Sequence, residues 1–376
     1  MKVAVLKEDA PETRVSLLPE HVQSLTKLNC EVLIESGAGI LSAAVDQDYV
    51  DAGAKVVDLA SIKDQADIIL VINPPQFEDL RATRAKVILG MFQPLNFPQK
   101  LEEYGQGSAA IFSMDMLPRI TRAQSMDVLS SQANIAGYKA VLVAANEYPR
   151  YFPMFMTAAG TIKPAKVLIL GAGVAGLQAI ATAKRLGAVV EVFDTRPAVK
   201  EEVMSLGAKF VEVEGAADAT AAGGYAVEQS EDYKARQQER INESVAKADI
   251  IITTAQIPGR KAPILITDAM INRMKQGSVI IDLAASTGGN TTITQDNATV
   301  VERGIKVVGN SNLPSAMPSD ASKVYGKNIL NFLALIIDKE GNLNLNFEDD
   351  LVKGTCVLNE GKITNERILA LMPVTN

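Results

Sequence analysis

Short apolar runs alternate with segments of helical spacing along almost the whole 376-residue chain. This alternation is typical of parallel β-sheets whose strands are joined by helices. The strands predicted in the first third of the chain are residues 3–6, 31–35, 67–72, 86–92 and 109–114. A second series of predicted strands comprises residues 167–170, 189–194, 209–213, 249–254, 278–283 and 305–308. We therefore expect an α/β fold with two doubly wound sheets.

The chain length and two long predicted helices indicate how these sheets are divided into domains. Residues 130–146 are rich in alanine and lack proline, so we interpret them as a long helix that joins the domains. A second predicted helix, 321–338, follows the last strand and returns the chain to the first domain. We expect two Rossmann-like domains with a cleft between them. Their predicted limits are residues 1–130 with 322–376 for the first, and 131–321 for the second.

Bulk properties exclude some classes of partner. The net charge of −7 argues against nucleic acid or an anionic membrane surface as a purely electrostatic partner. The N-terminus lacks the features of a signal peptide, and the apolar run 329–337 falls short of the ~20 residues of a membrane-spanning helix. We expect a soluble chain that could still dock onto a membrane protein. Cys30 and Cys356 suffice for neither a disulfide framework nor a zinc site, and we expect no metal.

A glycine-rich turn follows the predicted strand 167–170 and opens a helix. Its sequence is Gly171-Ala172-Gly173-Val174-Ala175-Gly176, which matches the dinucleotide-binding fingerprint G-x-G-x-x-G. In that fingerprint the first glycine permits the tight turn and the second lets the backbone approach a pyrophosphate. The third glycine lets the helix pack closely, while the helix N-terminus faces the phosphates. A tight turn without a ligand is the alternative, and the flanking strand and helix make it the weaker one.

Asp194 ends the next predicted strand, 18 residues beyond Gly176. A carboxylate at this position accepts hydrogen bonds from ribose hydroxyls and repels a 2′-phosphate, which favours NAD(H) over NADP(H). Arg196 lies close enough in sequence to weaken this preference.

Further candidates lie in loops that we expect at the carboxyl edge of the sheet, where doubly wound proteins bind ligands. Ordinary turn chemistry remains an equally good explanation for any one of them. A stretch rich in Gly, Ala and acidic residues, 214–232, is predicted to be a loop that is either functional or disordered. The residues expected to bind NAD(H) are Gly171, Gly173, Val174, Ala175, Gly176, Asp194, Thr195, Arg196, Gly224, Thr254, Ala255, Gln256, Leu283 and Asn312.

The chain contains a single histidine, His21, which we expect to be a solvated residue on the helix 19–28. A dehydrogenase that oxidises an alcohol or an amine must also move a proton, usually through histidine or lysine. No such group is evident here. Hydride transfer between two nicotinamide rings requires none, so the sequence agrees with that chemistry without proving it.

Several motifs resemble one family, the alanine dehydrogenases and transhydrogenases. Lys7-Glu8 with Glu12-Thr13-Arg14-Val15, together with the fingerprint at Gly171, resembles the family as a whole. The segment 118–127, Pro-Arg-Ile-Thr-Arg-Ala-Gln-Ser-Met-Asp, is similar to the hallmark loop of the NAD(H)-binding component of proton-translocating transhydrogenases. This resemblance continues through residues 130–132, 136–138, 157–161 and 223–226, and it covers essentially the whole chain.

The resemblance implies roles for five residues. Arg119 and Asp127 would hold the nicotinamide end of the cofactor, and Ser130 would help to fix its carboxamide. Gln124 would reach toward a second nucleotide on a partner domain, and Tyr225 would ride on a mobile loop that closes over bound nucleotide. From the residues alone, a surface ion pair between Arg119 and Asp127 is the simpler reading. The loop around Tyr225 could equally be flexible without closing over anything.

Differences from alanine dehydrogenase are equally informative. The substrate lysine of that enzyme is replaced by Asn73, its histidine by Gln93, and its aspartate before the paired glycines by Ser286. Arg14, which there holds the substrate carboxylate, is retained and could be structural here. Amino-acid dehydrogenation is therefore doubtful.

The resemblance implies that the chain binds NADH and passes hydride to NADP+, which a partner domain holds. Its partners would be the membrane-spanning and NADP(H)-binding components of a transhydrogenase, with protons crossing through the membrane component. The chain would be a homodimer, peripheral on the cytoplasmic face of the membrane. Two alternatives remain open: an alanine dehydrogenase-like oxidoreductase, and a non-enzymatic NAD(H)-sensing module.

Overall fold

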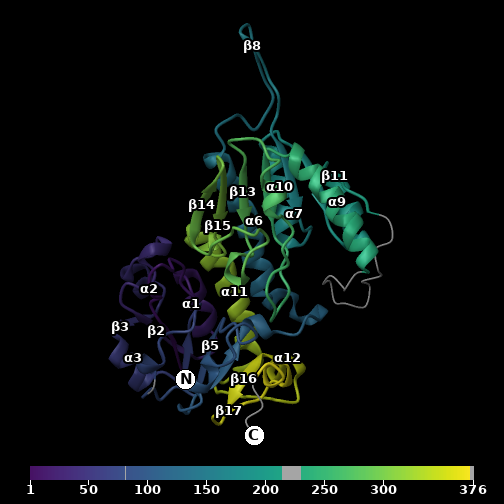
Figure 1. The fold of residues 1–376 in the computed structure, drawn as a ribbon. Helices are drawn as coiled ribbons and strands as arrows, with labels where there is room; N and C mark the ends of the chain where they lie inside the picture. Colours follow the sequence, from purple (N-terminus) through teal and green to yellow (C-terminus); the bar gives the residue numbers. More distant parts are fainter. Residues whose placement is uncertain (81, 214–229, 373–376) are drawn as a thin grey trace. The chain divides into compact units, whose positions relative to one another are not determined.

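The computed structural model describes residues 1–80, 82–213 and 230–372. The chain divides into two compact units (Figure 1). Unit 1 comprises Met1–Gln132 and Ser315–Asn376, and unit 2 comprises Ala133–Pro314. Among the described residues, no helix is both long enough and apolar enough to cross a membrane.

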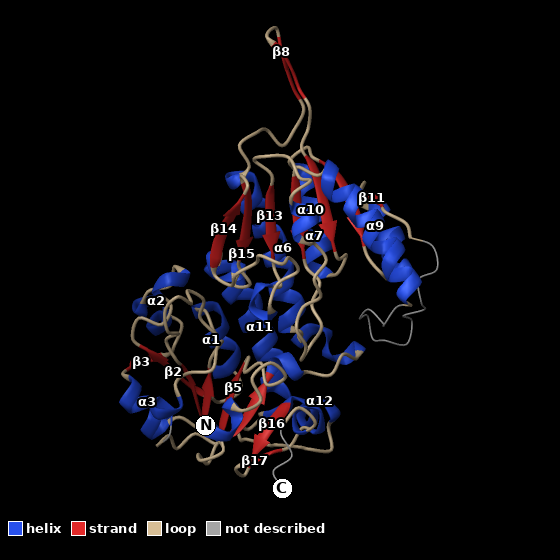
Figure 2. Cartoon of the chain, in the orientation of Figure 1, coloured by secondary structure: helices blue, strands red, loops and turns tan. Residues whose placement is uncertain are grey.

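Unit 1 is built on an eight-stranded sheet of order β17-β16-β6-β5-β4-β1-β2-β3 (Figure 2). Six strands are parallel: β1 (Lys2–Val5), β2 (Glu31–Glu35), β3 (Lys55–Val57), β4 (Ile68–Leu70), β5 (Val87–Gly90) and β6 (Ala110–Ser113). Two strands complete the sheet in antiparallel sense: β16 (Cys356–Asn359) and β17 (Lys362–Ile363). The strand order reverses between β1 and β4, which is the switch point of a doubly wound sheet.

Helices cover both faces of this sheet, because neighbouring residues of a strand point to opposite sides. Val3 and Val5 of β1 join one apolar cluster, whereas Ala4 joins the other. The first cluster includes α11, whose Tyr325 and Phe332 are fully buried. The helices of unit 1 are α1 (Pro19–Thr26), α2 (Asp46–Asp51), α3 (Leu59–Gln65), α4 (Phe77–Leu80), α5 (Lys100–Tyr104), α11 (Pro318–Ile336), α12 (Asp350–Thr355) and α13 (Glu366–Leu369).

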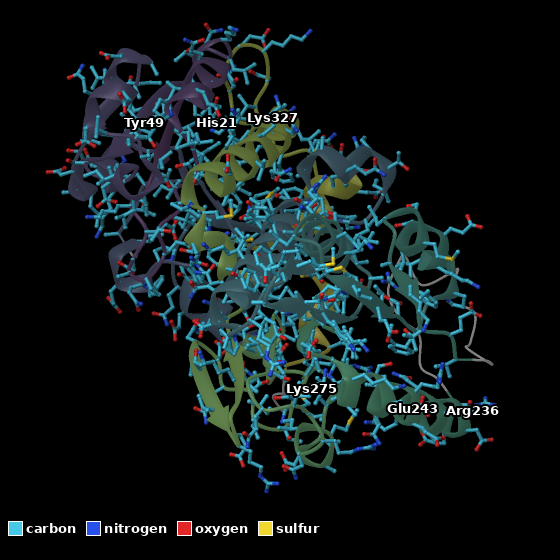
Figure 3. All side chains as sticks on the ribbon, turned by 90° about the horizontal axis from the view of Figure 1, so that it is seen from above. His21, Tyr49, Arg236, Glu243, Lys275 and Lys327 are labelled. Atoms are coloured by element: carbon cyan, nitrogen blue, oxygen red, sulfur yellow. The ribbon has the colours of Figure 1, made fainter. Side chains whose placement is uncertain are left out.

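His21 is buried between α1 and α11, so the prediction of a solvated histidine is wrong. It is only 5% exposed, and its Nδ1 accepts a hydrogen bond of 3.0 Å from the backbone N–H of Leu18. A Cβ atom at Gly326 of α11 would lie 2.4 Å from the ring, so the glycine leaves room for the histidine. Figure 3 shows His21 beside Lys327 of α11. Burial lowers the pKa of His21, which keeps it neutral and structural.

Unit 2 is built on a seven-stranded sheet of order β11-β10-β9-β12-β13-β15-β14. Its parallel strands are β9 (Lys166–Leu170), β10 (Val189–Phe193), β11 (Lys209–Phe210), β12 (Ile250–Thr253), β13 (Val279–Asp282) and β15 (Ile305–Gly309). An antiparallel strand, β14 (Ala298–Glu302), forms one edge. The strand order reverses between β9 and β12, the two strands that precede the fingerprint turn and the loop at Thr254.

The helices of unit 2 are α7 (Val174–Arg185), α8 (Lys200–Ser205), α9 (Glu231–Lys247) and α10 (Asp268–Ile271). The long helix α6 (Val128–Glu147) begins in the first segment of unit 1 and continues into unit 2, where Ala140, Val141 and Ala144 join the core. A separate hairpin, β7 (Phe155–Thr157) with β8 (Gly160–Ile162), projects from the rest of unit 2 (Figure 1).

The predicted fold class of two doubly wound α/β sheets is confirmed, whereas several element limits were wrong. Residues 231 and 232 belong to helix α9 rather than to the predicted loop 214–232. The predicted helix 267–275 ends as a helix at Ile271, and the predicted strand 209–213 pairs only over two residues. Strands β3, β7, β8, β14, β16 and β17 had not been predicted. These strands are short or lie at sheet edges, so their apolar signal is weak.

Candidate functional site

The fingerprint turn of unit 2 has the backbone that its glycines predict. Gly171 has φ +107°, and a Cβ atom there would lie 2.3 Å from the hydroxyl oxygen of Thr254. A Cβ atom at Gly176 would lie 1.9 Å from the carbonyl oxygen of Gly171. At Gly173 an added Cβ would meet nothing within 4 Å among the described residues. The first and third glycines are thus required by packing inside the protein, and the second leaves open space beside the turn.

The N-terminus of α7 is also open to a ligand. Gly173 is its N-cap residue and has no side chain that could cap the helix. The first-turn N–H groups therefore remain available to an anion, and the helix dipole favours negative charge there. Helix α6 packs against this same turn, since a Cβ atom at Gly137 would lie 2.0 Å from the carbonyl oxygen of Ala175.

Asp194 at the end of β10 is 8% exposed and is held by the fingerprint turn. Its Oδ2 accepts a hydrogen bond of 2.7 Å from the N–H of Ala172. Arg196 donates to the same carboxylate from its backbone N–H and from its guanidinium, at 2.7–2.9 Å. This pairing raises the pKa of Arg196. Because Arg196 is committed to Asp194, the pair presents no free guanidinium aimed at a 2′-phosphate, and a ribose would have to compete with Arg196 for the carboxylate.

The loop after β12 lies directly against the fingerprint turn. The N–H of Thr254 bonds to the carbonyl of Leu170 at 3.0 Å, and its hydroxyl bonds to the carbonyl of Gly171 at 3.2 Å. The side chain of Gln256 donates to the carbonyl of Leu283 at 2.9 Å. Thr254, Gln256 and Leu283 thus meet at the switch point of this sheet. Thr195 follows Asp194 directly, and Asn312 lies beyond β15, where its N–H bonds to the side chain of Asn310 at 2.8 Å.

The hallmark segment of unit 1 brings two predicted site residues together. Asp127 accepts hydrogen bonds from the N–H and the hydroxyl of Ser130, at 2.9 and 2.6 Å, and so caps the start of α6. Gln124 and Arg119 are exposed. The backbone of Ser125 is held by Asn328 and Asn331 of α11, at 2.9 and 2.8 Å.

An N-terminal polar cluster occupies the carboxyl ends of β1 and β4 in unit 1. It consists of Glu8, Glu12, Arg14, Asn73 and Gln132. Arg14 is 4% exposed and donates to both carboxylate oxygens of Glu12, at 2.7–2.8 Å. Its third guanidinium nitrogen donates to Gln132 at 2.7 Å. Asn73, the residue that replaces the substrate lysine, donates to Glu12 at 3.0 Å. The charge of Arg14 is therefore used inside the protein rather than offered to a substrate carboxylate.

The same N-terminal segment anchors the second passage between the units. The N–H of Thr13 bonds to the hydroxyl of Ser315 at 3.0 Å, and its hydroxyl donates to the carbonyl of Ser315. Gln132 and Ser315 are the residues at which the chain leaves and re-enters unit 1. Both bond to consecutive residues of one short loop, which explains a structural use for the retained Arg14.

The remaining sequence candidates have different outcomes. Gly224 and Tyr225 lie outside the described residues. Gln93 has a left-handed backbone with φ +49°, and the N–H of Ser286 bonds to the hydroxyl of Ser311 at 2.8 Å. Sequence reasoning missed Gly137 and Asn290, although a glycine inside a helix and an Asn after two glycines are signals that could have pointed to them. The predicted nucleotide contacts stay predictions.

The two units define a class of protein: a doubly wound α/β protein whose second unit carries a dinucleotide-binding turn. The family model of the alanine dehydrogenase/PNT N-terminal domain matches residues 4–136, and that of the C-terminal domain matches residues 140–366. The chain belongs to the alanine dehydrogenase/PNT family.

Within this family the chain is most informatively compared with three proteins. It is 46% identical to the first of the chains that make up the NAD(P) transhydrogenase alpha subunit of Rhodospirillum rubrum, over 97% of this chain and 98% of that protein. A transhydrogenase structure from Sinorhizobium meliloti has a TM-score of 0.87 at 44% identity, covering 96% of this chain and 100% of the other. An L-alanine dehydrogenase structure has a TM-score of 0.79 at 25% identity, covering 99% of each chain. The resemblance to the transhydrogenase component is confirmed, and the similarity to alanine dehydrogenase is lower.

Proposed function

We propose that this chain is the NAD(H)-binding component of a proton-translocating NAD(P) transhydrogenase, which passes hydride from NADH to NADP+ held by a partner domain. The observation that carries the proposal is the contrast between the two units. The fingerprint turn of unit 2 is open at Gly173, whereas Arg14 of unit 1 is buried against Glu12 and Gln132. The nucleotide site is thus retained, and the residue that would hold a substrate carboxylate is already occupied.

The residues present fit an NAD(H) molecule. The first turn of α7 would bind the pyrophosphate, and Asp194 would bind the adenosine ribose. NADH supplies the hydride itself. The task of the chain is alignment, since hydride transfer needs reacting carbons within roughly 3–3.5 Å of one another. Asp127, Ser130 and Arg119 would hold the nicotinamide end, Gln124 would approach the second nucleotide, and Tyr225 would close over the cofactor.

The proposed partners are a membrane-spanning component and an NADP(H)-binding domain, with the chain on the cytoplasmic face of the membrane. A homodimer is also proposed, and the β7–β8 hairpin supports it. All six strand residues of this hairpin are exposed, including Phe155 at 43% and Met156 at 71%. An isolated two-stranded hairpin is marginally stable in water. A second copy of the chain is the partner that we propose to cover it.

The test is hydride transfer in a mixture of the purified chain with a transhydrogenase NADP(H)-binding domain. We expect rapid transfer from NADH to an NADP+ analogue, and a loss of about 10²-fold in Gln124→Ala and Asp127→Asn, because small misplacements of the reacting groups cost this much. NADH affinity should fall far less than the transfer rate.

Asp349→Asn is the matched control. Asp349 pairs with Arg122 of the same segment at 2.5–2.7 Å, but on the exposed surface, so transfer should stay within about twofold of the unmodified chain. NADH binding without transfer to any acceptor would sink the donor role and favour a sensing module. NADH oxidation by pyruvate and ammonium would instead establish an alanine dehydrogenase-like enzyme.

A further inference from the structure

Asn290 is a buried side chain that none of the roles above uses. It follows the glycine pair Gly288-Gly289 in the loop after β13 and is 0% exposed. Burying an amide is costly unless its donors and acceptor find partners. The partners that Asn290 has chosen therefore indicate what it does.

The amide of Asn290 bonds to both backbone polar groups of one residue, Ala255. The N–H of Ala255 donates to its Oδ1 at 3.1 Å, and its Nδ2 donates to the carbonyl of Ala255 at 2.8 Å. Nδ2 also donates to the carbonyl of Pro263 at 2.9 Å. These bonds fix the peptide planes on either side of Ala255, so the path of the chain after β12 depends on this one side chain.

Asn290 is itself held firmly by the sheet. Its N–H donates to Oδ2 of Asp282, the last residue of β13, at 2.6 Å. Its carbonyl accepts hydrogen bonds from Leu265 and Ile266, at 2.8 and 3.0 Å. Asp282 is fully buried and also accepts from Ala284 and Thr294. The anchor of Ala255 is thus rooted in a central strand rather than in another loop.

Glycine is required where this loop turns toward Asn290. Gly289 has φ +77°, and a Cβ atom there would lie 2.5 Å from Cβ of Thr294 and 2.8 Å from a carboxylate oxygen of Asp282. The Gly-Gly-Asn sequence therefore places the amide at a defined position. Its target, the segment 254–256, begins at Thr254 against the fingerprint turn and ends at Gln256 against Leu283.

We propose that Asn290 is a positioning residue for NAD(H), which acts through Ala255 to hold the segment 254–256 in the shape that receives the cofactor. The inference rests on the proposed function, because it assumes that the carboxyl edge of unit 2 binds NAD(H). The side chain of Asn290 acts at one remove from the cofactor and has no part in the chemistry.

The test compares NADH dissociation constants of Asn290→Asp and the unmodified chain between pH 6 and pH 8, by fluorescence titration. The two side chains have the same shape, but ionised aspartate would place a negative oxygen opposite the carbonyls of Ala255 and Pro263. At pH 8 we expect affinity to be at least tenfold weaker. At pH 6 the ratio should shrink to a few-fold, because a protonated carboxyl again donates to one carbonyl and burial favours that form.

A control in the same region separates positioning from general damage. Thr253 precedes the segment, is 0% exposed, and has a hydroxyl with no hydrogen-bond partner among the described residues. Thr253→Val should leave NADH affinity within about twofold at every pH. If Asn290→Asp does not fold, Asn290→Ser serves instead, with weakened binding expected at all pH values because its hydroxyl cannot reach both carbonyls.

Two outcomes would overturn the inference, and they can be told apart. A lowered melting temperature with unchanged NADH affinity in the folded Asn290 variants would make the residue merely structural. Absence of NADH binding by the unmodified chain would remove the proposed function and this inference with it.

Discussion

Two carboxylates of the N-terminal polar cluster have opposite protonation behaviour. Glu8 accepts hydrogen bonds from the backbone N–H groups of Ile72 and Asn73, at 2.6 and 3.0 Å, yet burial outweighs them and raises its pKa to about 7. Burial also opposes the ionisation of Glu12, but there the hydrogen bonds and charge of Arg14 prevail and lower the pKa to about 2. The difference arises because Glu12 has a cation at contact distance and Glu8 has only amides.

Glu8 should therefore make the stability of the protein depend on pH. Its pKa is higher in the folded protein than in the unfolded chain, so its contribution is complete below about pH 4.5 and is lost as pH rises toward about 7. In Glu8→Gln this loss is absent. Between pH 5 and pH 8, the free energy of unfolding of the unmodified chain should fall by roughly 1–3 kcal/mol more than that of the variant.

Urea unfolding at several pH values measures this difference, with unit 1 followed by its own spectroscopic probe because a two-unit chain need not unfold in one step. Glu102→Gln, at an exposed position of α5, is the control and should keep the pH profile of the unmodified chain. Parallel profiles for Glu8→Gln and the unmodified chain would contradict the prediction.

At the scale of elements, the fingerprint turn depends on a helix–helix contact within unit 2. Gly137 lets α6 approach the carbonyl of Ala175 in the first turn of α7, where an added Cβ would lie only 2.0 Å from that oxygen. A glycine inside a helix costs about 1 kcal/mol relative to alanine, so its presence indicates a packing requirement. The position of the nucleotide-binding turn is thus set partly by α6.

Gly137→Val should push α6 and α7 apart. We expect a destabilisation of about 1–3 kcal/mol from overpacking and a weaker affinity for NADH, because the first turn of α7 moves. Thermal unfolding and NADH titration together measure both effects. Asn146→Val places the same β-branched residue at an exposed position of α6 and should change NADH affinity little. Equal NADH affinities for Gly137→Val and the unmodified chain would show that the contact is not needed for the site.

At the scale of the whole molecule, the β7–β8 hairpin concerns assembly rather than the fold of either unit. Its exposed apolar residues include Phe155, Met156 and Ile162. Replacing all three by serine should convert a dimer into a monomer in light scattering after gel filtration, since burial of apolar area stabilises association. NADH affinity of the monomer should stay within a few-fold of the original.

The matched control changes exposed apolar residues elsewhere. Ile40 and Leu41 of unit 1 are 57% and 60% exposed, and their replacement by serine should leave the dimer intact. A dimer that survives the hairpin substitutions, or a chain that is monomeric from the start, would contradict this role of the hairpin.

The sequence by itself determined the features that depend on neighbouring residues. The apolar runs predicted the central strands of both sheets, because a strand buried on both faces is continuously apolar. The turn at Gly171 was predictable because its glycines meet local demands of backbone angle and close packing. The family was predictable from the segment 118–127, which the comparisons support.

Only the tertiary structure decided which polar groups find each other. Arg14 bonds to Gln132, 118 residues away, and Asn290 bonds to Ala255, 35 residues away. His21 is buried because Gly326 of α11 makes room for it, and no pattern around residue 21 records that contact. Periodicity and turn chemistry act over a few residues, whereas a buried hydrogen bond is chosen from all the groups that the completed fold brings within reach.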